Sequence, residues 1–185
     1  MNLPKITKLY TTATHDNWAE GHVDPSWQLA HRDLNYTNQA YNDDDTVARW
    51  KSHGLDFKHY TGDLINHNDC PEWAHDLCRG IGLDNVGISL YRMCPGRILP
   101  RHSDTYRMYR KVLGINHTRI FRIVVFLEDW QSGHVLEVDQ QLVAGWHAGD
   151  WIGWRYDTPH LAANLGTTDR YTMQITGTYE DTKQQ

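Results

Sequence analysis

The chain has 185 residues, of which 18 are Lys or Arg and 23 are Asp or Glu, so its formal net charge is −5 at pH 7. This balance argues against nucleic acid as the general partner, and no window approaches the roughly 20 apolar residues that a membrane helix needs. Three cysteines without a Cys-x-x-Cys pair suggest neither a disulfide framework nor a structural zinc site. We expect one domain over residues 1–185, in a soluble, cytoplasmic protein with no membrane partner.

Residues 1–85 are expected to be helical and irregular and to support the rest of the chain. The segment DDDTVARWKSHG (43–54) begins with acidic residues and ends at a glycine, as a short helix does. The segment DCPEWAHDLCRGIG (69–82) has Pro71 near a first helical turn and Gly80 as a stop. These two segments predict two supporting helices.

Residues 86–179 change to the period of two that is typical of β-strands. Strands are predicted at 86–94, 119–127, 134–138, 141–144, 150–154 and 170–179, with tight turns and no helix between them. Such a run closes most easily into a sandwich or barrel. We therefore predict a mainly β protein with N-terminal helices, in which 86–179 form a double-stranded β-helix, a cupin-like jelly-roll barrel.

Four His-x-Asp pairs occur where roughly one is expected by chance. They are His22/Asp24, His31/Asp33, His67/Asp69 and His102/Asp104. The second pair lies in HRDLNYTN, which matches a protein-kinase catalytic loop, with Asp33 as the base and Asn38 as a magnesium ligand. Only 30 residues precede it and no Asp-Phe-Gly occurs, so we reject that interpretation. The first and third pairs lie in turn-like segments and are expected to have surface or capping roles.

Only the His102/Asp104 pair is expected to lie at the end of a β-strand, at the edge of the predicted barrel. Residues i and i+2 of an extended chain point the same way, so both side chains can reach one ion. Two histidines and one carboxylate suit iron(II) and leave three coordination positions open. His160, 56 residues after Asp104 and also at an expected strand end, supplies the third ligand. Three other histidines compete, two of them in predicted turns: His117, His134 and His147.

A polar stripe begins ten residues after His160. If residues 164–169 form a turn, Arg170 lies on the strand next to His160, and Arg170, Thr172, Gln174 and Thr176 share one face. An arginine there can bind a carboxylate through two parallel hydrogen bonds, with the Thr172 hydroxyl as a further donor. The alternative is that this face meets only water.

Basic residues gather around the His102/Asp104 pair. Eight of the 18 lie between residues 92 and 122, against a single acid, Asp104. They form either a solvated loop or a local positive field that attracts a small dianion. Trp154, on the strand that leads to His160, is a candidate to face the site.

In combination, these residues resemble the iron(II)/2-oxoglutarate-dependent dioxygenases, in particular the prolyl and aspartyl/asparaginyl hydroxylase-like branch. The resemblance covers about residues 86–177, through PGRILPRHSD, RIFRIVVFLEDW, the AGD turn, TPHLAANLG and DRYTMQITG. It implies that iron(II) is bound by three catalytic ligands, namely His102, Asp104 and His160. It also implies that the distal carboxylate of 2-oxoglutarate is bound by Arg170 with Thr172, and that Arg122 is a weaker candidate for a second carboxylate contact.

The reaction implied by the resemblance is hydroxylation of an unactivated C–H bond by O2, with release of succinate and CO2. Asp104 favours hydroxylation over halogenation, because halogenating relatives replace the carboxylate ligand with a small residue. Desaturation stays open. The substrate is a small molecule or a peptidyl side chain, for which the basic surroundings suggest an anionic group. Residues 1–85 and the loop 105–118 have no counterpart in the family motif, so they are expected to supply the substrate pocket and a lid.

Two alternatives remain open at this point. A metal-binding, cupin-like enzyme that does not use 2-oxoglutarate would not need Arg170. A non-catalytic jelly-roll binding module would hold no metal, and its histidines and aspartate would be incidental.

Overall fold

The computed structural model describes residues 8–9, 32–33, 44–54, 63–65, 70, 72–79 and 83–179. Its elements are β1 (Lys8–Leu9), β2 (Arg32–Asp33), α3 (Asp44–Ser52), β3 (Asp63–Ile65), α4 (Glu72–Arg79), β4 (Asp84–Met93), β5 (Ile98–His102), α5 (Arg107–Leu113), the 3-10 helix η3 (His117–Arg119), β6 (Ile120–Phe126), β7 (His134–Val138), β8 (Gln141–Val143), β9 (Trp151–Arg155), β10 (His160–Asn164) and β11 (Arg170–Thr178). The prediction of a mainly β protein with N-terminal helices is confirmed. None of the described helices is long and apolar enough to cross a membrane.

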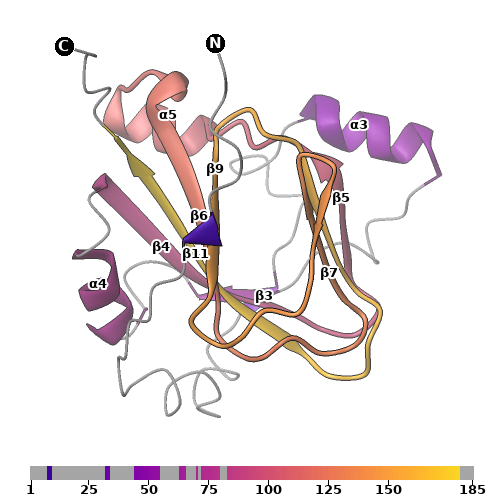
Figure 1. Ribbon diagram of the computed structural model, residues 1–185. Helices are drawn as coiled ribbons and strands as arrows, with labels where there is room; N and C mark the ends of the chain where they lie inside the picture. Colours follow the sequence, from indigo (N-terminus) through magenta and orange to yellow (C-terminus); the bar gives the residue numbers. More distant parts are fainter. Residues whose placement is uncertain are drawn as a thin grey trace.

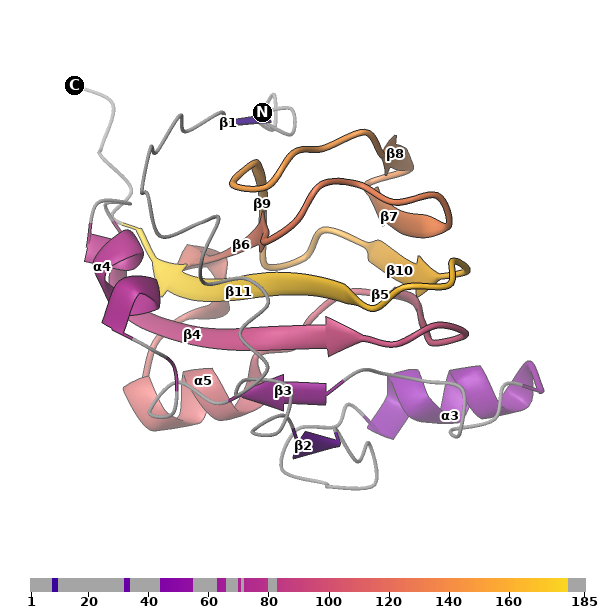
Figure 2. The ribbon, with the colours of Figure 1, turned by 90° about the horizontal axis from the view of Figure 1, so that it is seen from below.

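The strands form two antiparallel sheets. The larger has the order β1-β9-β6-β11-β4-β3-β2 and the smaller has the order β5-β10-β7-β8. Figure 1 shows the two sheets facing each other, and Figure 2 shows β11 and β4 side by side in the middle of the larger sheet. From β4 to β11 the chain passes repeatedly from one sheet to the other. This winding is that of a double-stranded β-helix, so the predicted jelly-roll fold is confirmed.

The seven-stranded sheet carries apolar side chains on both of its faces. On β6, Ile123 and Val125 point into a cluster that includes residues of α4. The alternate residues Val124 and Phe126 point into a second cluster, which includes residues of β7 and β10 and therefore lies between the sheets. The period of two in a strand explains how one segment serves both clusters.

Two predicted boundaries hold because glycine tolerates a left-handed backbone. Helix α3 is followed by Gly54, which has φ +76°, and β4 is followed by Gly96, which has φ +79°. Few other residues adopt such angles without strain. The helix at 43–54 and the turn after residue 94 are therefore confirmed.

The prediction that no helix interrupts residues 86–179 is wrong. Helix α5 and the 3-10 helix η3 occupy much of the segment 105–118 that was expected to be a lid loop. The sequence of α5, RMYRKVL, consists mostly of good helix formers. Its Tyr109 hydroxyl also donates to the carbonyl of Asn85, which ties the helix to the start of β4.

Two further differences concern strands that the local pattern does not reveal. Residues 160–164, expected to lie between the end of the strand at 150–154 and a turn at 164–169, form a strand of their own, β10, which is one of the two central strands of the smaller sheet. Residues 1–85, expected to be helical or irregular, contribute three short strands to the edges of the larger sheet: β1, β2 and β3. Pairing with β9 and β4 stabilises segments too short to show a period of their own.

Several predictions fall on residues outside the described part of the chain. These residues are His22, Asp24, His31, Asn38, His67 and Asp69, and of Asp33 only the backbone is described, in β2. The roles expected for three of the four His-x-Asp pairs, the single domain and its division at residue 85 therefore stay predictions.

Candidate metal centre

A cavity of about 100 Å³ lies between the two sheets. Apolar side chains from several strands form part of its wall: Tyr91, Leu99, Val124, Leu136, Trp154 and Ala162. The polar part contains the six residues expected to bind iron(II) or 2-oxoglutarate, together with Gln174: His102, Asp104, Arg122, His160, Arg170 and Thr172. The barrel thus brings together residues that lie far apart in the sequence.

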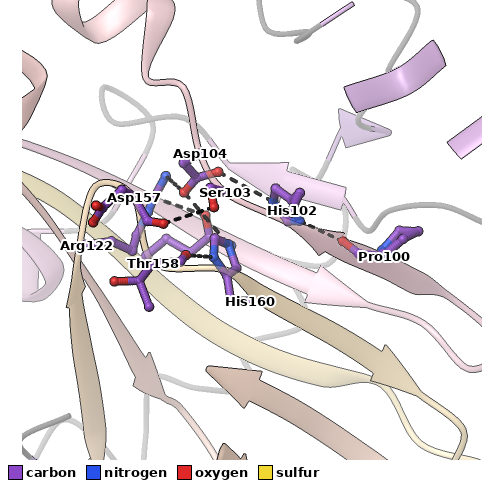
Figure 3. Close-up of polar contacts among 9 residues, drawn as sticks. Pro100, His102, Ser103, Asp104, Arg122, Asp157, Thr158 and His160 are labelled. Atoms are coloured by element: carbon purple, nitrogen blue, oxygen red, sulfur yellow. Dashed lines mark hydrogen bonds and ion pairs between the residues drawn. The ribbon is translucent and has the colours of Figure 1, made fainter. Parts of the chain in front are cut away.

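Three candidate metal ligands lie at one end of this cavity. His102 ends β5 and His160 begins β10, and the two are register partners across the antiparallel pair. Asp104 follows in the loop after β5, and its carboxylate faces both rings from one side (Figure 3). Its Oδ1 is 3.5 Å from His102 Nε2 and its Oδ2 is 3.9 Å from His160 Nε2. The three ligand atoms lie within 4.8 Å of one another, so they could hold one metal ion.

Backbone carbonyls fix which ring nitrogens are available to a metal. His102 Nδ1 lies 2.7 Å from the Pro100 carbonyl oxygen, and His160 Nδ1 lies 3.0 Å from that of Thr158. A carbonyl can only accept, so in each ring Nδ1 carries the hydrogen and donates it. In the neutral rings the Nε2 lone pairs therefore face Asp104, which is the tautomer that metal-ligating histidines use.

The charges at this end favour ligation as well. Burial alone would raise the pKa of Asp104, but the Arg122 guanidinium beside it holds that pKa well below its usual range. Burial lowers the pKa of His160 to about 4, although the Asp104 carboxylate opposes this shift. Near neutral pH the site therefore offers a carboxylate anion and a neutral His160 imidazole, and neither must lose a proton to bind a cation.

Arg122, on β6, lies beside Asp104. Its Nη2 donates to Asp104 Oδ2 at 3.2 Å and its Nη1 donates to Gln174 Oε1 at 3.3 Å. Its guanidinium carbon also lies 5.2 Å from the centre of the Tyr106 ring. The guanidinium thus contacts a candidate metal ligand, Asp104. The contact with the cosubstrate that was expected for Arg122 is not tested by the structure.

Arg170 lines the same cavity from β11, and its guanidinium is almost completely buried. The side chain is 3% exposed, and its Nη1 donates to the Val135 carbonyl at 2.7 Å. Its Nε has no hydrogen-bond partner among the described residues. Burial lowers its pKa to about 10, although Tyr91 and Glu128 favour the charged form. A buried cation with an unused donor is costly unless a ligand completes its hydrogen bonds.

The prediction that Arg170 lies on the strand next to His160 is wrong. Its strand β11 pairs with β4 and β6 in the larger sheet, whereas His160 lies on β10 in the smaller sheet. The two residues instead line one cavity from facing sheets. The prediction failed because the turn after β10 carries the chain into the other sheet and does not form a hairpin. The face shared by Arg170, Thr172 and Gln174 is as predicted, and it lines the cavity instead of meeting bulk water.

Aromatic residues complete the surroundings of the two histidines. Trp154 lines the cavity as expected, with its ring 4.9 Å from that of His160. Trp50 on α3 packs edge-on against the His102 ring at 5.7 Å, a contact that sequence reasoning missed. Of the competing histidines, His134 and His147 do not line the cavity: His134 is buried and stacks on Trp146, and His147 is exposed. The side chain of His117 lies outside the described part of the chain.

The cationic side chains near the site fall into two groups. Arg101 pairs with Glu137, and Arg122 pairs with Asp104. Arg107, Arg110 and Lys111 are exposed on α5, which starts three residues after Asp104. Whether these exposed cations attract an anion or form a solvated basic surface is not tested by the structure.

Comparisons with known proteins find only distant structural likenesses. No protein-family model matches the chain, and no curated protein matches it. A prolyl-4-hydroxylase from Pseudomonas putida is similar at 15% identity, with 74% of this chain and 84% of that chain covered and a TM-score of 0.48. KdgF from a Halomonas species is similar at 12% identity, covering 65% and 82% at a TM-score of 0.41. A predicted oxalate decarboxylase from Thermotoga maritima is similar at 15% identity, covering 63% and 80% at a TM-score of 0.41. These likenesses are too distant to carry an argument.

Proposed function

We propose that this chain is an iron(II)- and 2-oxoglutarate-dependent dioxygenase that hydroxylates an unactivated C–H bond and releases succinate and CO2. One observation supports this most directly. Three candidate metal ligands and a buried arginine with an unused donor line a single cavity. A metal site alone would not require that arginine, and a carboxylate-binding site alone would not require the histidines.

The donor set fits iron(II). His102 Nε2, His160 Nε2 and one oxygen of Asp104 would hold the ion, and three positions would stay open. When bound, iron(II) with 2-oxoglutarate supplies the activation of O2 that breaks the substrate C–H bond.

The chain's own residues have distinct tasks in this proposal. Arg170 Nε and the Thr172 hydroxyl bind the distal carboxylate of 2-oxoglutarate, in surroundings where little water competes. The apolar wall, which includes Leu136 and Ala162, keeps water from the reacting atoms. The backbone carbonyls of Pro100 and Thr158 hold both imidazole rings in the orientation that the metal needs.

The substrate is proposed to be a small molecule or a peptidyl side chain with an anionic group. The exposed cations of α5, a helix that starts three residues beyond Asp104, support this proposal. They would raise the local concentration of an anion near the metal end of the cavity.

An anaerobic titration of the iron(II)-loaded protein with 2-oxoglutarate tests the proposal. We expect the visible metal-to-ligand charge-transfer band of a chelated 2-oxo acid. The variant Arg170→Ala should keep iron and need more 2-oxoglutarate, whereas His160→Ala should lose both ligands. Arg119→Ala is the control, because Arg119 is exposed, bonds to the Tyr179 carbonyl and does not line the cavity. Folded, iron-loaded protein without the band would reject the proposal in favour of a metal enzyme that does not use 2-oxoglutarate.

A further inference from the structure

Asp104 is held differently from the two histidines beside it. His102 and His160 lie on paired strands, and a backbone carbonyl orients each ring. Asp104 lies in the short loop between β5 and α5, where no strand pairing fixes its position. A carboxylate with two equivalent oxygens can also bind a cation through one or both of them. Contacts other than strand pairing must therefore fix the orientation of the Asp104 carboxylate.

Arg122, in the opposite sheet, makes a contact that can fix the Asp104 carboxylate. It lies on β6 in the larger sheet, and its two terminal nitrogens reach Asp104 Oδ2 and Gln174 Oε1. The Gln174 contact, from the neighbouring strand β11, keeps the planar guanidinium from turning. The ion pair is largely enclosed, with side-chain exposures of 16% for Arg122 and 24% for Asp104.

Tyr106, in the same loop as Asp104, packs against this contact through its stacking on Arg122. Its side chain is 9% exposed, and its ring lies under the Arg122 guanidinium. Its backbone has φ 50° and ψ 29°, a left-handed conformation that is strained for a residue other than glycine. Such strain persists when surrounding contacts hold the residue in place, and it often marks functional sites. The stacked guanidinium is a contact that can hold it.

We infer that Arg122 is a positioning residue for the metal centre: it occupies one oxygen of Asp104 so that the carboxylate binds the metal through the other oxygen alone. The inference rests on the proposed metal centre, but it assigns Arg122 a different role from the cosubstrate contact expected from sequence. The two roles make opposite predictions. A positioning residue changes metal binding without any cosubstrate, whereas a cosubstrate contact changes only the binding of 2-oxoglutarate.

Cobalt(II) binding tests the inference, because the visible spectrum of this ion reports its coordination and requires neither O2 nor 2-oxoglutarate. The main variant is Arg122→Lys, which keeps the positive charge but loses the planar fork and the stacking on Tyr106. We expect about ten-fold weaker cobalt(II) binding and a shifted spectrum, since partners that orient metal ligands are typically worth 10–100-fold. Arg119→Lys, an exposed arginine near the start of the same strand, should bind like the parent.

A double-mutant cycle shows whether Arg122 acts through Asp104. In an Asp104→Ala background, Arg122→Lys should no longer alter the cobalt(II) affinity or spectrum. Thermal unfolding and circular dichroism check that each variant is folded, and Arg122→Met serves as a second variant if Arg122→Lys is unstable. An effect of equal size in both backgrounds would overturn the inference, as would an unchanged spectrum with weaker 2-oxoglutarate binding. A parent protein that does not bind cobalt(II) would overturn the metal centre itself, and the inference with it.

Discussion

The two sheets contribute to the cavity in different ways. The four-stranded sheet supplies the two histidines at its rim, whereas the seven-stranded sheet supplies Arg122, Arg170 and Thr172. The larger sheet is packed on both faces, and the smaller sheet packs in the cluster between the sheets. Its outer strand β8 has Leu142 70% exposed. We therefore expect the larger sheet to contribute most of the free energy of unfolding, while strand ends of the smaller sheet supply metal ligands.

The largest expected effect compares how much free energy of unfolding is lost when one buried side chain is removed from each sheet. Met173 on β11 is fully buried in the cluster that includes α4, so Met173→Ala should cost about 4–5 kcal/mol of the free energy of unfolding. Leu136 on β7 faces the existing cavity, so Leu136→Ala should cost only about 2–3 kcal/mol. Urea unfolding measures both values. A larger loss at Leu136 would contradict the proposed distribution of stability.

The second prediction separates ligation from packing within the smaller sheet. His160→Ala should weaken cobalt(II) binding by more than about 100-fold, because it removes a ligand rather than a supporting contact. The control is His134→Ala, since His134 is a second buried histidine of this sheet and bonds to the Thr168 carbonyl. That variant should lose about 1–3 kcal/mol of stability and keep its metal affinity. Equal metal affinities in the two variants would remove His160 from the centre.

The parts of the site that sequence predicted are those fixed by local geometry. The closeness of His102 and Asp104 follows from the single residue between them, and the alternation along residues 170–176 follows from any extended backbone. The sequence could not show which strands face each other, because strand order depends on pairing between distant segments. The placing of Arg170 beside His160 failed for this reason.

Contacts that join distant segments were missed for the same reason. Gln174 was read as one member of a polar stripe, and its contact with Arg122 depends on β6 and β11 being neighbours. Trp50 lies 52 residues before His102, and no local pattern relates the two rings. Tyr106 stands in a segment expected to be a lid, where its strained backbone and its contact with Arg122 carry no sequence signal.

The third prediction concerns the cost of keeping a cation inside the larger sheet. Burial lowers the pKa of Arg170, so folding disfavours its charged form, and a neutral side chain of similar length should stabilise the ligand-free protein. We expect Arg170→Met to raise the free energy of unfolding by about 1–2 kcal/mol. Added 2-oxoglutarate, with metal present, should stabilise the parent but not this variant. Differential scanning calorimetry measures both effects. The matched control is Arg101→Met in the smaller sheet, whose partly exposed pair with Glu137 should be worth less than about 1 kcal/mol.

The smallest expected effect tests whether the larger sheet recognises the cosubstrate through more than one side chain. Thr172 is buried on β11 and lines the cavity two residues after Arg170. Thr172→Val keeps the shape of the side chain and removes one hydroxyl, so 2-oxoglutarate affinity should fall about five-fold, the equivalent of one neutral hydrogen bond. Thr172→Ser, which retains the hydroxyl, should bind 2-oxoglutarate within about two-fold of the parent, and neither variant should alter cobalt(II) binding. If Thr172→Val binds as tightly as the parent, Arg170 alone holds the distal carboxylate, and the smaller sheet must contribute whatever further selectivity the site has.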